Sequence, residues 1–389
     1  MSILKNIIVV GGSYVGVNAA QQLASKFSGH FRVLLIEKHS HFQHLFAFPR
    51  FAVTDKVDTK KAFIPFVPGT FAACPPGSGS FVQASVTGVT KDSVNLDRKV
   101  EIDGQLLDSI PFAYLVIATG TKLTPPSTIP YDGKAEGVAY LQNHVQKVIS
   151  SSSIVIIGAG AVGVQMATDI KELYPEKSVT LVHSRKNVMN RFNTKLHDLI
   201  AERSAELGIN LKLGSRVKLP PGGYPTDGST FDVELEDGAK IPADLAIIAT
   251  GQTPQSDLLK ELSPESVGDD SFVRVSKTLQ LLDERYPNIF AVGDVAATGA
   301  HKAARPAVRQ AALVVENIHH LVHDEPLEHY EILEPPAIHM SLGITKNVVF
   351  RDPGPDSPEP TIIPRIDGTL DMNIDGVWER RGGGPNALL

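Results

Sequence analysis

Residues 7–16 read Ile-Ile-Val-Val-Gly-Gly-Ser-Tyr-Val-Gly, and residues 154–163 repeat the pattern as Ile-Val-Ile-Ile-Gly-Ala-Gly-Ala-Val-Gly. In each stretch an apolar run ends in closely spaced glycines, which is typical of a buried parallel strand that turns sharply into a helix. Such a turn presents backbone N–H groups to a pyrophosphate, and a bulky side chain there would keep the phosphate away. Two copies in one chain predict two dinucleotide sites between which electrons can pass.

The rest of the chain also repeats, as expected of an internal duplication. Each copy has a predicted second strand, then an Asp-Gly turn, then a closing apolar strand. In the first copy these are residues 31–37, 103–104 and 114–120, and in the second they are residues 178–183, 237–238 and 245–251. A last apolar run, 288–294, ends in Gly293-Asp294 and precedes a predicted helix over 303–320.

We expect the run at 288–294 to return to the first sheet. The pattern then predicts an α/β fold of two Rossmann-like dinucleotide-binding domains, the second inserted in the first, with a small C-terminal segment. The predicted boundaries are 1–125 and 255–325 for the first domain, 126–254 for the second and 326–389 for the C-terminal region. In that region we predict a strand over 342–350, a proline-rich loop over 352–364 and a hairpin over 367–378.

The residue that follows each second strand predicts which nucleotide is bound. Glu37 can accept hydrogen bonds from both ribose hydroxyls of an adenosine and would repel a 2′-phosphate, so the first site is expected to hold FAD or NAD. The second copy has no acid there. Arg185, after His183, can pair with a 2′-phosphate, helped by Lys186 or Arg191, which indicates an NADPH site that tolerates NADH. The alternative is that Arg185 is a solvated surface arginine.

Gly293-Asp294 is a third candidate element of the site. A carboxylate at this strand end suits a ribityl hydroxyl of FAD, and the next helix would direct its N-terminus toward the flavin. The helix dipole can then stabilise the negative charge that develops on reduction. Lys302, at the start of that helix, could add a full positive charge, or it could be an ordinary surface lysine.

Composition excludes several other classes of protein. Hydrophobic residues at 42% and charged residues at 21% are ordinary for a globular protein, and the net charge of −6 argues against nucleic acid as a main partner. No apolar run reaches the roughly 18 residues that span a bilayer. Cys74 is the only cysteine, so no intrachain disulfide or redox dithiol can form. With a first strand expected from Ile7, which leaves no room for a cleavable leader, this predicts a cytoplasmic rather than secreted protein.

Over about residues 5–325 the chain resembles the two-dinucleotide-binding-domain flavoproteins, and most of all the apoptosis-inducing-factor-like group that includes the ferroptosis suppressor proteins. Type II NADH dehydrogenases are a more distant likeness. The stretch 174–184, Tyr-Pro-Glu-Lys-Ser-Val-Thr-Leu-Val-His-Ser, is the most specific. The other stretches that carry the resemblance are 9–16, 42–50, 117–120, 157–170 and 291–294.

The resemblance implies FAD on the first domain and NAD(P)H on the second, with hydride transfer to the flavin and electron transfer to a quinone or another flat aromatic acceptor. Together with the motifs, it predicts FAD contacts at Gly11, Gly12, Ser13, Tyr14, Val15, Gly16, Glu37, Lys38, Arg50, Val86, Ala118, Thr119, Gly120, Gly293, Asp294 and Lys302. The predicted NAD(P)H contacts are Gly158, Gly160, Ala161, Val162, Gly163, His183, Arg185 and Gly251.

Departures from the family pattern keep other functions open. Ser13 replaces a glycine, and Gln165 stands where the family has a glutamate near the nicotinamide, so this side chain can hydrogen-bond but cannot act as a base. Lys302 and Gln165 are the candidate catalytic residues. Gln165 and the divergent C-terminal region favour an alternative, a tailoring flavoenzyme of specialised metabolism that acts on one aromatic product. A non-enzymatic redox-sensing flavoprotein is a third hypothesis.

Remaining expectations concern metals, assembly and membranes. His39, His41 and His44 are interpreted as a loop packed on the first site, and His319 and His323 as a solvated helix face, so no metal site is predicted. The resemblance implies a monomer or homodimer and, as among relatives, possible peripheral association with membranes or lipid droplets.

Overall fold

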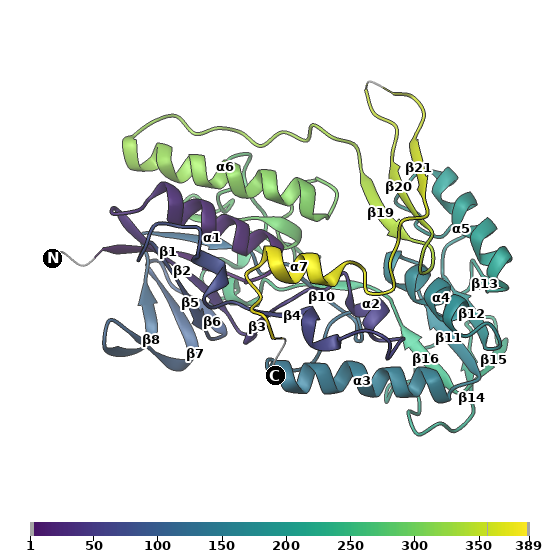
Figure 1. Cartoon of the computed structure of the whole chain (residues 1–389). Coiled ribbons are helices and arrows are strands. Elements are labelled where there is room, and N and C mark those ends of the chain that lie inside the picture. Colours follow the sequence, from purple (N-terminus) through teal and green to yellow (C-terminus); the bar gives the residue numbers. More distant parts are fainter. Residues whose placement is uncertain (1–3, 356, 387–389) are drawn as a thin grey trace.

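The computed structural model describes residues 4–355 and 357–386 and contains two parallel sheets (Figure 1). The first sheet has the order β18-β9-β1-β2-β5, and the second has the order β13-β12-β11-β16. The strands of the first are β1 (Lys5–Val10), β2 (Phe31–Glu37), β5 (Gly79–Gln83), β9 (Tyr114–Ile117) and β18 (Ile289–Ala291). Those of the second are β11 (Ser153–Ile157), β12 (Ser178–Val182), β13 (Asn210–Lys212) and β16 (Leu245–Ile248).

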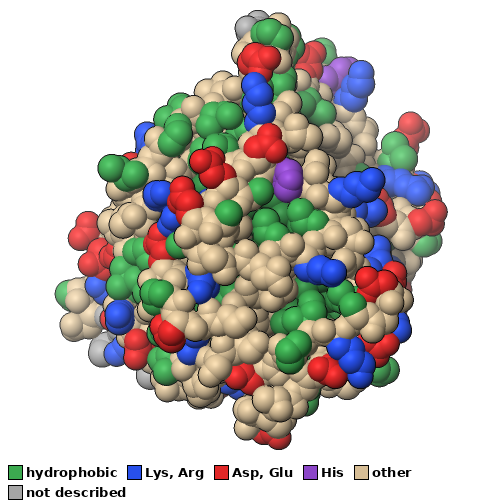
Figure 2. Space-filling model, turned by 90° about the vertical axis from the view of Figure 1, so that its right-hand side faces the viewer, with side chains coloured by type: hydrophobic (Ala, Val, Ile, Leu, Met, Phe, Trp, Pro, Cys, Tyr) green, Lys and Arg blue, Asp and Glu red, His purple; other side chains and the backbone are tan. Residues whose placement is uncertain are grey.

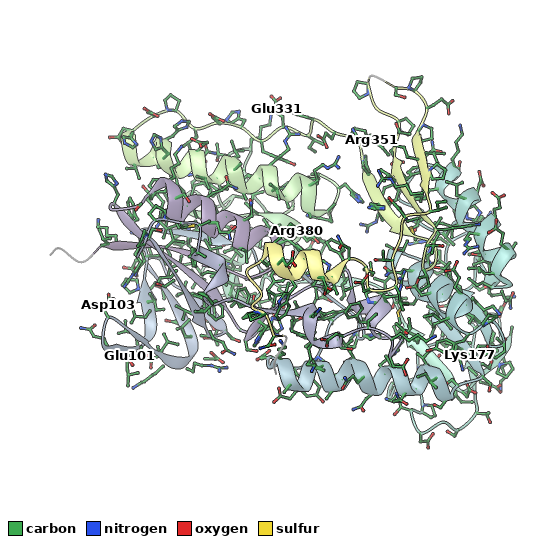
Figure 3. All side chains as sticks on the ribbon, viewed as in Figure 1. Glu101, Asp103, Lys177, Glu331, Arg351 and Arg380 are labelled. Atoms are coloured by element: carbon green, nitrogen blue, oxygen red, sulfur yellow. The ribbon has the colours of Figure 1, made fainter. Side chains whose placement is uncertain are left out.

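The first sheet is buried on both faces, which explains its continuous apolar strands. Ile7 and Val9 of β1 pack toward α1 (Tyr14–Lys26) and α6 (Ala304–His323). Ile8 and Val10 point the other way, toward an antiparallel sheet of β6 (Val86–Val89), β7 (Ser93–Ile102) and β8 (Gln105–Pro111). The predicted Asp103-Gly104 turn is confirmed at the β7–β8 tip, where both residues have positive φ (Figure 3).

The second sheet is built in the same way. Helices α4 (Ala161–Leu173) and α5 (Thr194–Leu207) cover one face, and the hairpin of β14 (Phe231–Glu234) and β15 (Lys240–Ala243) covers the other. The segment that forms the second sheet is inserted in the sequence between β9 and β18, and these two strands pair with each other in the first sheet. The predicted α/β fold with two dinucleotide-binding domains is confirmed.

Two chain crossings join the two halves. They form the paired strands β10 (Thr121–Leu123) and β17 (Gln252–Pro254), which run antiparallel. Beside them Thr119 Oγ1 donates to the Gln255 carbonyl at 2.6 Å, and Gln255 Nε2 donates to the Thr119 carbonyl at 2.7 Å. The other elements between and around the sheets are β3 (His41–Gln43), α2 (Phe48–Phe51), η1 (Thr59–Ala62), β4 (Phe63–Pro65), η2 (Gly69–Phe71), α3 (Lys134–Ser150), η3 (Asp257–Leu259), η4 (Pro264–Ser266) and η5 (Gly293–Val295).

The C-terminal region differs from two of the three predictions made for it. This region forms a sheet of β19 (Ala337–Ser341), β20 (Asn347–Arg351) and β21 (Thr361–Arg365). The strand predicted over 342–350 is confirmed only over 347–350, in β20, because 342–346 form the turn from β19, and β21 occupies the end of the predicted loop. Its Pro364 is tolerated because β21 is an edge strand. In place of the predicted hairpin, α7 (Ile374–Arg380) buries Ile374 and Trp378, four residues apart on one helix face (Figure 1).

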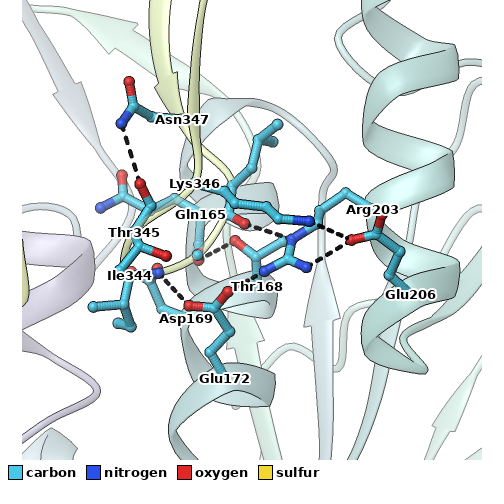
Figure 4. Close-up of polar contacts among 12 residues, drawn as sticks. Gln165, Thr168, Asp169, Glu172, Arg203, Glu206, Ile344, Thr345, Lys346 and Asn347 are labelled. Atoms are coloured by element: carbon cyan, nitrogen blue, oxygen red, sulfur yellow. Dashed lines mark hydrogen bonds and ion pairs between the residues drawn. The ribbon is translucent and has the colours of Figure 1, made fainter. Parts of the chain in front are cut away.

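The second domain holds this C-terminal sheet through charged side chains (Figure 4). Glu172 of α4 pairs with Arg203 of α5 and accepts a hydrogen bond from the Ile344 backbone N–H at 2.5 Å. Arg203 Nε donates to the Leu342 carbonyl at 2.9 Å. A Cβ at Gly343 would lie 2.5 Å from the Glu172 carboxylate, so the turn before β20 fits closely against α4. Among the residues that the structure describes, no helix is both long and apolar enough to cross a bilayer.

We expect acid to destabilise the fold through His144 of α3. Its Nδ1 donates to the Ala52 carbonyl at 2.7 Å, and burial lowers its pKa to about 4. In the unfolded chain this histidine has a pKa of about 6.5. Between pH 6.5 and 4 it therefore binds a proton in the unfolded state but stays neutral in the folded state. The stability from this neutral histidine is therefore complete above pH 6.5 and is lost progressively toward pH 4.

The measurement is the melting temperature against pH for the wild type, His144→Gln and a control, His30→Gln, at an exposed histidine. The His144 variant should start from a lower melting temperature at pH 7 and lose less between pH 6.5 and 4. Equal losses in all three proteins would contradict the assignment.

Candidate functional site

One cleft of about 2320 Å³ runs between the two domains and contains nearly all of the predicted site. It is lined by both glycine turns, by the ends of β9 and β16, by the segment from Gly293 to Arg305 and by the C-terminal region. Of the predicted contact residues, Gly16, Gly163 and Arg185 are not part of its lining. Viewed from the end of the molecule, charged side chains of both signs are interspersed rather than gathered into one basic patch (Figure 2).

The two glycine turns have nearly identical backbone geometry. Gly11 and Gly158 have φ of +106° and +111°, a region that L side chains rarely adopt. A Cβ at Gly16 would lie 1.7 Å from the Gly11 carbonyl oxygen, and one at Gly163 would lie 1.8 Å from that of Gly158. Gly16 and Gly163 therefore permit the close approach of helix to strand, although they do not face the cleft.

Ser13 fits the turn without strain. It precedes α1 with φ −89° and ψ −162°, close to the −79° and −174° of Gly160, its counterpart before α4. A Cβ at Gly160 would meet nothing within 4 Å, so this position accepts a side chain. The Ser13 hydroxyl makes no capping hydrogen bond and lines the cleft, where it can donate to a phosphate.

Glu37 is held at the end of β2 by three donors. Its Oε2 accepts from the Gly12 N–H at 2.6 Å, and its Oε1 accepts from the His39 N–H at 2.9 Å and lies 2.5 Å from His39 Nδ1. Burial works to raise the pKa of Glu37, but these donors outweigh it and hold the pKa below the usual value. Glu37 is thus ionised at neutral pH and faces the cleft as a hydrogen-bond acceptor. Lys38 and Val86 line the cleft beside it.

Asp294 and Lys302 lie together before α6. Burial raises the pKa of Asp294, opposed by the Lys302 charge, and burial lowers the pKa of Lys302, opposed by Asp294. The Lys302 ammonium donates to the Ala296 carbonyl and lies 4.6 Å from the centre of the Phe272 ring. It is half-buried and lines the cleft, so it is not an ordinary surface lysine.

Arg50 is engaged mainly by other parts of the chain. It is 1% exposed and pairs with the fully buried Asp169 of α4 through Nε at 2.5 Å and Nη2 at 2.9 Å. Its other N–H groups donate to the carbonyls of Gly343 at 2.9 Å, Thr369 at 3.1 Å and Leu370 at 3.4 Å. Because all five of its N–H donors then have acceptors, only its apolar stem and planar face remain for a cofactor. Contact with FAD stays a prediction for Arg50.

Gln165 reaches the cleft from α4 and touches the C-terminal region. Its Nε2 donates to the Met372 sulfur at 3.5 Å, a weak hydrogen bond that a ligand amide could replace. Met372, Met340 and the exposed Leu333 also line the cleft, although the sequence reasoning assigned none of them to the site. They follow no periodic pattern, so only tertiary structure could reveal them.

The second glycine turn has no acid beside it, as the sequence predicts. His183 lines the cleft at the end of β12, whereas Arg185 is exposed and lies outside the lining. At the far end of α6, potential ligand atoms of His319, His320 and Glu325 lie within 4.8 Å of one another. His323, which the sequence analysis grouped with His319, is not part of this cluster, and none of the three residues lines the cleft.

Comparison with known proteins identifies relatives of this architecture. A family model described as pyridine nucleotide-disulphide oxidoreductase matches residues 5–311. Fe-regulated protein 8 of Mycosarcoma maydis is 34% identical over 97% of this chain and 95% of its own, and ferroptosis suppressor protein 1 of Mus musculus is 28% identical over 88% and 87%. The solved sulfide:quinone oxidoreductase of Aquifex aeolicus has the same fold, with a TM-score of 0.74 and 19% identity over 98% of this chain and 92% of its own.

Proposed function

The chain belongs to the pyridine nucleotide-disulphide oxidoreductase family, and on that premise we propose that it transfers electrons from NAD(P)H through FAD to a quinone or another flat aromatic acceptor. The family and the ferroptosis suppressor relatives make it an FAD-dependent NAD(P)H oxidoreductase. The observation that best supports the proposal is that both glycine turns open into one continuous cleft. A nucleotide on each turn can then extend toward the other without leaving the protein.

The residues at the first turn fit an FAD molecule. Gly11 and Gly12 allow the chain to turn tightly against Ala118 and Glu37 and lead to the start of α1, where N–H groups and the helix dipole favour a pyrophosphate. Glu37 is positioned to accept hydrogen bonds from the adenosine ribose. When bound, FAD supplies the hydride acceptor and then the electron donor for the second substrate.

The residues at the centre of the cleft would orient the reactants and adjust the charge around them. In this proposal Asp294 would hold a ribityl hydroxyl. The Lys302 ammonium, near the start of α6, would offset the negative charge that the flavin acquires on reduction. Gln165 is placed to hydrogen-bond the nicotinamide amide. None of these side chains needs to move a proton, because hydride transfer depends chiefly on alignment and exclusion of water.

The test is anaerobic stopped-flow mixing of the purified protein with NADPH or NADH, followed by mixing with a panel of quinones. We expect the flavin absorbance near 450 nm to bleach with a reduced nucleotide and to return on addition of a quinone. Flavin that is reduced but not reoxidised by any quinone would favour the tailoring enzyme. A long-lived charge-transfer band with slow reoxidation by every acceptor, oxygen included, would favour the redox sensor.

One observation keeps the tailoring alternative in view. The C-terminal region supplies Met340, Met372 and Leu333 to the wall of the cleft. Adaptable apolar side chains of this kind suit one particular aromatic product as well as they suit quinones.

A further inference from the structure

The cleft that contains the second glycine turn is also lined by a cation, Arg216, that the sequence pattern did not point to. The Ser215 N–H donates to the His183 carbonyl and the Gly214 N–H donates to the Arg185 carbonyl, both at 2.9 Å. These bonds align the segment after β13 with the end of β12. They place the backbone at Ser215, directly before Arg216, against the backbone at His183. Arg216 and His183 both line the cleft, whereas Arg185 does not.

His183 presents a hydrogen-bond donor that has no acceptor. Its Nδ1 accepts from the Ala159 N–H at 3.2 Å. Burial lowers the pKa of His183, against the nearby Asn190 amide, and the Arg185 charge lowers it further, so the ring is neutral at pH 7. A neutral imidazole that accepts at Nδ1 carries its proton on Nε2. That Nε2 is buried and, among the residues that the structure describes, has no hydrogen-bond partner.

The charge around this donor suits an anion. The described residues of the second domain that line the cleft include no aspartate or glutamate. The nearest counter-charge to Arg216 is Glu236 at 3.6 Å, and both side chains are more than half exposed, so this pair is weak and leaves guanidinium donors available. Arg191 also lines the cleft, but its charge acts on His301 and Lys302, which lie before α6.

We propose that Arg216 and His183 Nε2, rather than Arg185, bind the 2′-phosphate of NADPH and make the second site select NADPH over NADH. A phosphate dianion is the acceptor that both donors lack, and a guanidinium can bind two of its oxygens at once. An unphosphorylated ribose would leave Arg216 without an anion. The inference rests on the proposed function, because it assumes that the second turn holds the nicotinamide nucleotide.

The test measures binding of 2′,5′-ADP and 5′-ADP to the oxidised flavoprotein by calorimetry, so it needs no turnover. Arg216→Ala should weaken 2′,5′-ADP binding by about 10- to 100-fold, the usual effect of losing a charge-assisted hydrogen bond, and leave 5′-ADP binding unchanged. Arg185→Ala is the matched control and should change neither. His183→Glu, which restores an acid beside the ribose, should reverse the preference of kcat/KM from NADPH to NADH.

Three results would overturn the proposal: equal binding of the two nucleotides by the wild type, no binding of 2′,5′-ADP, or a loss of 2′,5′-ADP affinity in Arg185→Ala instead of Arg216→Ala. Failure of the proposed function has a different signature. In that case 2′,5′-ADP binds in an Arg216-dependent way, but neither NADPH nor NADH bleaches the flavin.

Discussion

Replacing Gly16 with alanine should give a colourless protein, whereas Gly163→Ala should give a yellow protein that NAD(P)H does not bleach. The two glycines are equivalent in the duplicated turns, and a Cβ at either would overlap a backbone carbonyl oxygen, at 1.7 Å for Gly16 and 1.8 Å for Gly163. The helix must then move away from the strand, which displaces the N–H groups that hold the pyrophosphate. We expect affinity for the nucleotide at the altered turn to fall at least about 100-fold, or about 2.7 kcal/mol.

The measurements are the 450 nm absorbance of freshly purified protein and its anaerobic bleaching by NADPH. Gly160→Ser is the matched control, since it copies the serine already present at Ser13 and a Cβ there meets nothing within 4 Å. That variant should stay yellow and folded by circular dichroism. If Gly16→Ala kept its colour, or if Gly163→Ala were reduced at the wild-type rate, the assignment of the two turns would be wrong.

Replacing Asp169 with asparagine should lower the free energy of unfolding by about 3–5 kcal/mol, the usual cost of breaking a buried ion pair by removing one partner. Burial raises the pKa of Asp169 to about 6, against the Arg50 charge, so the carboxyl is ionised at pH 7 and balances Arg50. The asparagine keeps the size of the side chain but leaves a buried guanidinium without its counter-charge. Because Arg50 links α2, α4 and the C-terminal region, we expect FAD to be released more easily as well.

The check is the urea midpoint together with the melting temperature, with Asp103→Asn as the control. Asp103 pairs with Arg32 at 2.6 Å but is 65% exposed, so its loss should cost less than about 1 kcal/mol. The double variant Arg50→Met/Asp169→Leu removes both charges and should recover part of the loss. Equal costs for Asp169→Asn and Asp103→Asn would refute the role given to the buried pair.

Local patterns predict the central strands of the two sheets well, because β1, β9, β11 and β12 are buried on both faces and are therefore largely apolar. The edge strands β5 and β13 are partly exposed and polar, and the sequence analysis did not predict them. The glycine positions are predicted equally well, since positive φ and close backbone contact exclude any other residue at Gly11 or Gly158. Ser13 is also consistent with its sequence interpretation, because the turn has room for a side chain at that point.

Interactions between distant segments could not be predicted in the same way. The hydrogen-bond acceptors of Arg50 lie more than a hundred residues away in sequence, at Asp169 and from Gly343 onward, so nothing near Arg50 in sequence reveals its role. The segment that carries Arg216 lies beside the end of β12 only because the parallel strands β12 and β13 end together. In the C-terminal region, five prolines obscured β21, and the spacing of Ile374 and Trp378 was a helix signal that the hairpin interpretation overlooked.

The five acceptors around Arg50 also impose an order on biosynthesis. Two of them, the carbonyls of Thr369 and Leu370, belong to a stretch of chain that is synthesised after every strand of both sheets. Domains generally form from the N-terminus during translation, so both sheets can assemble while this joint is still open. A chain truncated before residue 369 would therefore contain both dinucleotide-binding folds but would lack two of the hydrogen-bond acceptors that join them at Arg50. Cellular quality control can detect such a partly joined protein.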